Sequence, residues 1–306
     1  MGLAKFPLSV VVIAKNEAKS LGRCLQALDW CDDVIVVDDE STDETALIAT
    51  RRGARVVSHR FESFAAQRNW ALANADLKHP WALMLDADEV VTRELKSEIE
   101  RTLPRASGDL SGFRMCRKTM FLGKWLKYSD GFPVWIVRMV RVGRFQFEDS
   151  GHGEVAVPVN SGSLGTLFVP FVHYPFDKGL AHWLDRHNQY STREATLELR
   201  DLEGIRWRDL LSGDRAQRRR AWRGFSRRLP CRSLLRFFYQ YVIKRGFLDG
   251  YAGLAFSWLM ATYEGLIVLK RRELNQTQRN VDLRSAIHQS AEPGAEAQSG
   301  YCGCHD

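Results

Sequence analysis

The segment from Trp81 to Glu89 carries the most informative chemistry of the chain: apolar residues run directly into two carboxylates, Asp86 and Asp88, separated by one small residue. A short apolar run bounded by charge is typical of a buried strand, and open α/β sheets bind ligands at the carboxyl ends of their strands. Alternate residues of a strand share a face, so we expect Asp86 and Asp88 to project together. Such a pair would hold a divalent cation that carries a diphosphate. An acidic loop with helix-capping aspartates is the alternative for an isolated pair.

Polar residues also follow other predicted elements of the N-terminal half. The first predicted strand runs into Ala14, Lys15 and Glu17, the second ends in Asp39, and a predicted helix carries Arg68. Because parallel strands end at one edge of their sheet, we expect these residues to be neighbours in space. Asp39 could accept hydrogen bonds from a base or ribose, and Lys15 and Arg68 could bind a diphosphate. A capped turn at Asp39 and a solvated Arg68 remain the alternatives.

Alternating strands and helices must position these residues. We expect strands at 8–14, 33–39, 54–58 and 81–85, and helices at 16–28 with an Asn16 cap, up to 52 after Ser41 or Thr42, at 64–75, and at 93–103 after a Thr92 cap. This alternation predicts an α/β fold with a mostly parallel sheet covered by helices. Short β-like pieces from 111 to 171 predict a mixed extension, and residues 179–199, 234–244 and 251–270 predict helices.

The composition sets limits on the class of protein. The 306 residues suffice for one large domain with extensions, and 45% hydrophobic with 26% charged residues is typical of a globular chain. The net charge of +7 favours an anionic partner. The six scattered cysteines suit a reducing compartment, although Cys302, Cys304 and His305 could bind a metal. We find no signal-peptide core and no uninterrupted apolar run of membrane-spanning length, since Glu264 interrupts the best one.

A basic, aromatic segment lies between residues 206 and 228. Arginines there surround Trp222 and Phe225, a combination that suits an anionic membrane surface. A nucleic-acid backbone or plain solvent would fit the same charges. We expect attachment to the inner face of the cytoplasmic membrane, with no nucleic-acid partner.

The N-terminal half resembles a known family. The segments SVVVIAKNE, VIVVDDESTDET, AAQRNWALANA and WALMLDADE are similar to the nucleotide-sugar-binding half of family 2 inverting glycosyltransferases with the GT-A fold. The resemblance covers residues 6–120. The segments 135–138 and 151–154 and the sequence RGFLDGYAGL are similar to the lipopolysaccharide-core branch of that family.

The resemblance implies a donor site and a cofactor. Asp39 would contact the nucleotide base, and Asp88 with Asp86 would hold Mg²⁺ or Mn²⁺ on the diphosphate of a nucleotide-diphosphate sugar. Many family members have a hydroxyl or a tyrosine in the first loop, where this chain has Ala14 and Lys15. A lysine there could reach a phosphate instead.

An acceptor hydroxyl must lose its proton as it attacks, so a carboxylate facing the cation should act as general base. Asp149 is the first candidate, Glu154 the second and Glu148 the third, with His152 in the same loop as a metal ligand, a phosphate donor or a packed residue.

These inferences give four regions and three functions. We expect a nucleotide-sugar-binding half at 1–110, an acceptor-side part at 111–200, a membrane-associating helical region at 201–281 and a disordered tail at 282–306. The favoured function is sugar transfer to a cell-envelope glycolipid such as a lipopolysaccharide core sugar. Transfer to a polyprenyl phosphate is the alternative, followed by a non-catalytic protein that binds anionic lipid or nucleic acid. A dehydrogenase is disfavoured because no G-x-G-x-x-G follows the first strand.

Overall fold

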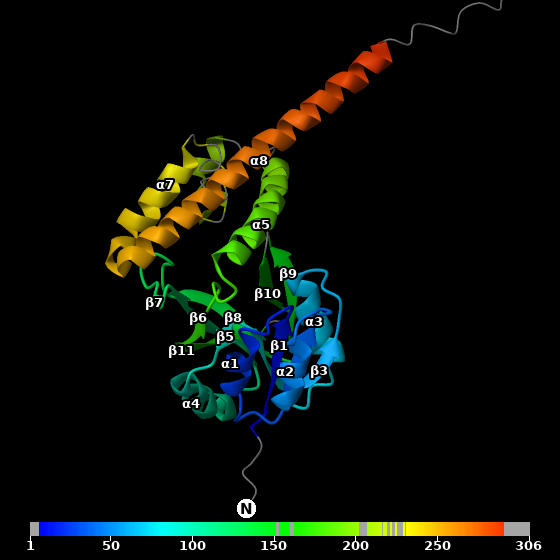
Figure 1. Ribbon diagram of the computed structural model, residues 1–306, viewed down its shortest axis with the longest axis vertical. Helices are drawn as coiled ribbons and strands as arrows, with labels where there is room; N and C mark the ends of the chain where they lie inside the picture. The colour runs from blue at the N-terminus through cyan, green and yellow to red at the C-terminus, as the bar shows by residue number, and fades with distance from the viewer. Residues whose placement is uncertain are drawn as a thin grey trace, which may run out of the picture.

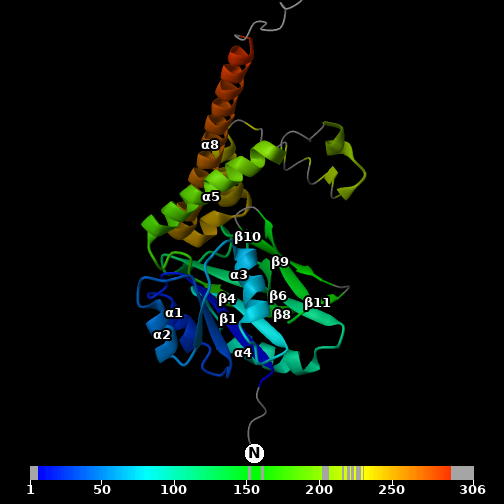
Figure 2. The ribbon, with the colours of Figure 1, turned by 90° about the vertical axis from the view of Figure 1, so that its right-hand side faces the viewer.

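The structure is a computed structural model that describes residues 6–150, 153–159, 162–201, 207–215, 217–218, 221, 224, 229 and 231–290. An α/β body carries the N-terminal half, and a helical region rises from one end of it (Figures 1 and 2). The far end of the last helix projects away from the body in both views.

Four parallel strands form one half of the main sheet, in the order β3-β2-β1-β4. Their bounds are β1 Leu8–Ala14, β2 Val34–Asp38, β3 Arg55–Ser58 and β4 Trp81–Asp86. Ile13 of β1 lies in register with Val37 of β2 and with Asp86 of β4. The polar residues that follow these strands therefore meet at one edge, as the sequence predicts.

Helices cover this half of the sheet: α1 Leu21–Gln26, α2 Thr45–Arg51, α3 Phe64–Asn74 and α4 Arg93–Thr102. The predicted cap at Thr92 is confirmed, since its hydroxyl accepts the Leu95 amide hydrogen. The predicted caps of the first two helices are wrong. Asn16 has a φ of 51° and instead accepts the backbone amide of Thr42 with its side chain. Here the loops after β1 and β2 hydrogen-bond to each other instead of capping helices.

The mixed extension continues the same sheet beyond β4, in the order β8-β6-β11-β5, with β8 antiparallel to β4. The bounds are β5 Glu89–Val90, β6 Leu110–Phe121, β7 Lys124–Trp125, β8 Val134–Arg141, β9 Phe145–Ser150, β10 Gly153–Pro158 and β11 Ser163–His173. The β9–β10 hairpin lies apart from this sheet and docks on α3, where Asn69 makes two hydrogen bonds to the backbone of Phe147. The region expected to form an acceptor side is thus built into the same body.

Strand alternation places two apolar clusters on the two faces of the sheet. Val10 and Val12 of β1 belong to the cluster with α1 and α4, and Val11 belongs to the cluster with α3 and the hairpin. β4 contributes to both, through Leu83 on one face and Met84 on the other. A strand buried on both faces carries a continuous apolar run, which explains the sequence of β4.

The helical region contains α5 Leu180–Asp201, α7 Arg232–Phe238 and α8 Gly250–Ser290, with short helical turns at Trp207–Leu211, Tyr239–Ile243 and Gly246–Asp249. Asp249 fastens it to the body: its carboxylate accepts the backbone amides of Tyr128 and Ser129 and the hydroxyl of Ser129. Phe256 of α8 also packs against Phe121 and Phe176.

The last helix is longer than the sequence suggests. α8 continues to Ser290, past residue 282, where we expected structure to end. Within the described residues, Gly246–Val281 is long and apolar enough, by length and composition, to cross a membrane. The interrupting charge of Glu264 is paired with Arg232 of α7 at 2.6 Å. α8 also packs along α5 and α7.

Candidate active site

The two aspartates of the acidic segment sit in different local structures. β4 ends at Asp86, Ala87 and Asp88 form a turn, and β5 begins at Glu89. The strand stops before Asp88, so strand alternation does not set the direction of the Asp88 side chain. Both carboxylates still lie close enough for the charge of Asp86 to act on Asp88.

Asp86 is bound on both oxygens by arginines. Its Oδ1 accepts Nη2 of Arg68 at 2.7 Å and its Oδ2 accepts Nη2 of Arg138 at 2.9 Å. Burial alone would raise the pKa of Asp86, but the guanidinium groups of Arg138 and Arg68 hold it below its usual range. Asp86 is thus a fixed carboxylate whose charge is already compensated by the protein.

A buried glutamate completes this network. Glu89 is 1% exposed, its Oε1 accepts Nη2 of Arg138 at 2.6 Å and its Oε2 accepts the backbone amide of Asp86 at 3.0 Å. Burial raises the pKa of Glu89 above its usual value, although Arg138 opposes this. Glu89 therefore anchors Arg138 next to Asp86 and the turn formed by Ala87 and Asp88, which is called the acidic turn below.

Arg68 and Glu154 belong to the same network. Arg68 is completely buried, and its Nε donates to Oε1 of Glu154 at 2.9 Å. Nη1 of Arg138 reaches the same Glu154 oxygen at 3.3 Å. The expected contact of Arg68 with a diphosphate, and its alternative as a solvated residue, both disagree with this burial. A side chain with no exposed surface positions Asp86 and Glu154 instead.

Asp149 and Glu154 are direct partners across the β9–β10 hairpin. Glu154 is partly buried in the arginine network, whereas Asp149 is exposed. Of the two expected bases, Asp149 is the one open to an incoming acceptor. Gly151 and His152 lie outside the described residues.

Asp88 faces His173, the last residue of β11. Its Oδ2 lies 3.6 Å from Nε2 of His173, and its side chain is 14% exposed. Burial lowers the pKa of His173, but the Asp88 carboxylate more than offsets this and raises it above its usual value. His173 Nδ1 is buried and finds no partner among the described residues. A carboxylate and an imidazole, both mostly buried, thus lie side by side at the acidic turn.

The loops after β1 and β2 form the neighbouring wall. Asp39 is almost fully buried, its Oδ2 binds Nζ of Lys15 at 2.6 Å, and its Oδ1 accepts the backbone amide of Phe61 at 2.9 Å. A base could reach Asp39 if the exposed Lys15 side chain moved aside. Ala14 is buried in the strand end and offers only its backbone.

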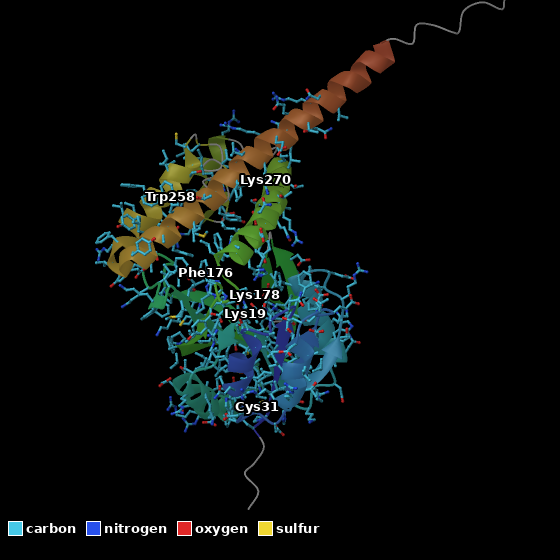
Figure 3. The ribbon with its side chains drawn as sticks, in the orientation of Figure 1. Lys19, Cys31, Phe176, Lys178, Trp258 and Lys270 are labelled. Atoms are coloured by element: carbon cyan, nitrogen blue, oxygen red, sulfur yellow. The ribbon has the colours of Figure 1, made fainter. Side chains whose placement is uncertain are left out.

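Glu17 lies between this wall and the helical region. Its Oε1 pairs with Nζ of Lys178 at 2.6 Å, and burial raises its pKa to about 7. His182 and Arg186 of α5 follow Lys178 at helical spacing, and the charge of Arg186 acts on both Asp86 and Asp88. Figure 3 places Lys178 where α5 meets the body. Arg186 therefore lies near enough for its charge to act on both aspartates, whereas burial and the neighbouring cations lower the pKa of His182 below its usual value.

Sequence reasoning missed three members of this site. These are Glu89, Arg138 and His173, to which the sequence analysis assigns no role. Arg138 lies 52 residues from Asp86, so only the pairing of β4 with β8 brings them together. The order Asp-x-Asp-Glu was the single local signal for Glu89.

The next question is whether metal-binding side chains cluster and whether the cysteines are paired. Within the described ranges, no group of three or more His, Cys, Asp or Glu side chains is gathered as a metal site. Cys24, Cys31, Cys116 and Cys231 are free thiols. Cys302, Cys304 and His305 lie outside the described residues.

The parallel sheet, its mixed extension and the acidic turn at the strand ends define an α/β protein with its candidate site at the carboxyl edge of the sheet. Residues 9–152 match the model of glycosyl transferase family 2. These residues, just under half of the chain, are similar to family 2, and the match indicates that the chain is a glycosyltransferase. A purely non-catalytic binding protein is thereby set aside.

Curated relatives agree with this class. The chain is 28% identical over 201 residues to the lipopolysaccharide core biosynthesis glycosyltransferase LpsC of Rhizobium meliloti (strain 1021), covering 63% of this chain and 72% of that protein. It is 40% identical over 94 residues to an uncharacterized glycosyltransferase of Rickettsia bellii (strain RML369-C), covering 30% of this chain and 31% of that one. The alignment thus spans about a third of the rickettsial relative.

A solved structure of S. aureus TarS 1-349 in complex with UDP-GlcNAc aligns with 89% of this chain and 92% of its own, with 14% sequence identity and a TM-score of 0.42.

Proposed function

We propose that this glycosyltransferase transfers a sugar, with inversion, from a nucleotide-diphosphate sugar to a lipid-linked acceptor of the cell envelope. The observation that carries the proposal is the acidic turn, where Asp88 and His173 lie side by side at the carboxyl edge of the parallel sheet. The charge of Arg186 acts on the aspartates at the same edge, and Lys178 pairs with Glu17 beside it. This pairing of acids and cations suits a diphosphate with its counter-ion.

The side chains at the acidic turn can hold Mg²⁺ or Mn²⁺, but the ligand set differs in part from the predicted pair of Asp86 and Asp88. Asp88 can offer a carboxylate oxygen and His173, once deprotonated, a ring nitrogen, whereas each Asp86 oxygen already accepts from an arginine and keeps only its remaining lone pair. Two protein ligands suffice for an ion that is otherwise held by substrate phosphates and water. When bound, such an ion would neutralise the leaving diphosphate.

The chain's own residues supply the remaining functions. Lys15 and Arg186 can balance the phosphate charge, and the buried arginine network fixes the acidic turn. Asp149, exposed at the end of β9, can accept the proton of an attacking hydroxyl. Attack from the face opposite the leaving group inverts the anomeric carbon and needs no covalent intermediate.

Two acceptor classes fit a lipid-linked substrate. A lipopolysaccharide core sugar is supported by the name of the rhizobial relative. A polyprenyl phosphate is supported by a specific feature, an apolar pocket beside the acidic turn. Replacing Asp149 by Asn and Glu154 by Gln separately distinguishes them, because a phosphate acceptor needs little general base while a hydroxyl needs one.

The exposed apolar side chains of the helical region support attachment to the cytoplasmic face of a membrane. Phe238, Ile243 and Phe247 are exposed, and Arg236, Lys244 and Arg245 lie among them in sequence. Apolar residues bordered by cations suit an anionic bilayer surface. Much of the basic segment, including Arg219, Arg220, Trp222, Arg223 and Phe225, lies outside the described residues.

A thermal-shift screen of nucleoside diphosphates, with and without Mg²⁺ or Mn²⁺, tests the donor proposal. Ligand binding to the folded state raises the melting temperature by mass action. We expect one base to give a metal-dependent rise that the Asp88→Asn variant loses. No rise with any base and either metal would count against a nucleotide-sugar donor.

A further inference from the structure

An apolar cavity of about 860 Å³ lies between the body and the N-terminal part of α8. It is lined by the β6–β7 turn, the segment after β11 and one face of α8, with Leu122, Tyr174, Phe176, Tyr251, Leu254 and Trp258 among its walls. Figure 3 shows Phe176 between the body and α8, and Trp258 on α8. Its volume is that of a site for a ligand of drug-like size.

The lining favours hydrocarbon over sugar. Asp177 is the one charged side chain of the lining, and its carboxylate already binds Arg23 and Ser20. The other walls are aliphatic and aromatic, apart from the tyrosine hydroxyls. A sugar ring would leave most of its hydroxyl groups without partners there, which costs free energy. A methylene chain has no polar group to leave without a partner, and its apolar surface is removed from water.

The cavity begins next to the acidic turn. The backbone amide of Tyr174, a lining residue, donates to the carbonyl oxygen of Asp88 at 3.0 Å. Lys178 and His182 lie on either side of the lining residues Gly179 and Leu180, and Nε2 of His182 is buried with no partner among the described residues. An anionic head group at this end of the cavity would meet the ammonium group of Lys178 and the unpartnered ring nitrogen of His182, while its chain entered the cavity.

We propose that the cavity binds the hydrocarbon chain of the acceptor, and that the acceptor is a lipid whose reacting oxygen is attached directly to that chain, as in a polyprenyl phosphate. The inference rests on the proposed function, because it names the acceptor class of the same site. An acceptor sugar separated from its acyl chains by further sugars could not place both parts here at once.

Calorimetric titration of the full chain with dimethylallyl, geranyl and farnesyl phosphates tests the inference, each below its micelle-forming concentration. Each methylene that enters the cavity should tighten binding about fourfold. We expect affinity to rise steeply from five to fifteen carbons for the unaltered chain. Tyr251→Ser/Trp258→Ser should flatten this dependence, since both side chains line the cavity and are 76% and 63% exposed.

Two further variants sharpen the result. Leu122→Ser tests the opposite wall of the cavity and should also weaken farnesyl phosphate binding. Leu269→Ser is the matched control: it removes an equally exposed leucine of α8 that does not line the cavity, and it should leave the chain-length dependence unchanged. Equal dependence in all variants would overturn the inference, because it would show that the chain binds elsewhere on the apolar surface.

The donor screen separates the two proposals. If nucleotide binding persists while prenyl chains bind no better with length, the acceptor inference fails and the proposed function stands. If no nucleotide shifts the melting temperature, the proposed function itself fails.

Discussion

The backbone amide of Tyr174 donates a hydrogen bond to the carbonyl oxygen of Asp88, with an N–O distance of 3.0 Å. This contact joins the acidic turn after β4 to the segment that leaves β11 for the helical region. β5 adds to the same junction, because Glu89 and Val90 pair with His173 and Val172. The turn that we propose binds the donor and the segment that lines the apolar cavity are therefore held together by backbone structure.

Asp88→Asn should reduce sugar transfer about 100-fold or more while the chain still folds. The change removes the negative charge that we propose supports the cation on the leaving diphosphate, and that cation provides several kcal/mol of transition-state stabilisation. Release of nucleoside diphosphate, measured with the donor that the thermal-shift screen identifies, provides the readout. Glu100→Gln, a surface glutamate of α4, is the control and should keep full activity. Comparable rates in both variants would remove Asp88 from the mechanism.

Arg138→Met should lower the free energy of unfolding by about 3–5 kcal/mol, because it leaves the buried charge of Glu89 without an arginine partner and leaves Asp86 with Arg68 alone. Urea unfolding of the purified chain measures the loss. Arg138→Met/Glu89→Gln should recover part of it, since the double change also removes one stranded charge. An Arg138→Met variant as stable as the original chain would show that the network contributes nothing to folding.

Glu17 should make stability depend on pH. Its pKa is about 7 in the folded chain and 4.5 for an ordinary glutamate, so the folded state binds more protons between these values. The free energy of unfolding should then fall as pH rises from about 4.5 to about 7, by up to about 3 kcal/mol. Denaturant midpoints of the original chain and of Glu17→Gln across this range isolate the effect. The variant should lack this decline, and parallel curves for the two proteins would contradict the assignment.

Asp249→Ala should loosen the helical region from the body. The carboxylate accepts two backbone amides and one hydroxyl from Tyr128 and Ser129, and buried donors left without partners cost about 1–3 kcal/mol each. Amide hydrogen exchange should rise in the turn around Ser129 and at the start of α8. Glu273→Ala, an exposed change on the same helix, should leave exchange at both places unaltered. Unchanged protection in the Asp249 variant would mean that apolar packing alone holds the region.

Local patterns predicted the strands and helices of the N-terminal half well. The apolar runs of β1, β2 and β4 are continuous because both faces of these strands are covered, and the Thr92 cap depends on its own backbone and the next turn. The failed caps at Asn16 and Ser41 have a non-local cause. Asn16 and Ser41 bind each other's loops across the sheet edge, a partnership that single-segment rules do not contain.

In the candidate site, too, the positions of the residues were predicted from local patterns, whereas their contacts were not. The acidic segment, Asp39, Lys15 and Glu17 all lie at the predicted edge, because parallel strands must end there. The states of these side chains could not be predicted from spacing. Arg68 looked like a phosphate ligand and is instead buried against Asp86 and Glu154. Its role depends on the hairpin that folds over α3.

By itself, the sequence determined the resemblance to family 2 glycosyltransferases, the class of fold and the sheet edge at which the candidate site lies, because apolar periodicity and short polar motifs act within a few residues. Only the tertiary structure decided which carboxylates are open and which are paired, since Arg138, His173 and Glu154 reach the acidic turn from strands far along the chain. It also decided that an apolar cavity lies beside Asp88, because three separate segments form the walls of that cavity.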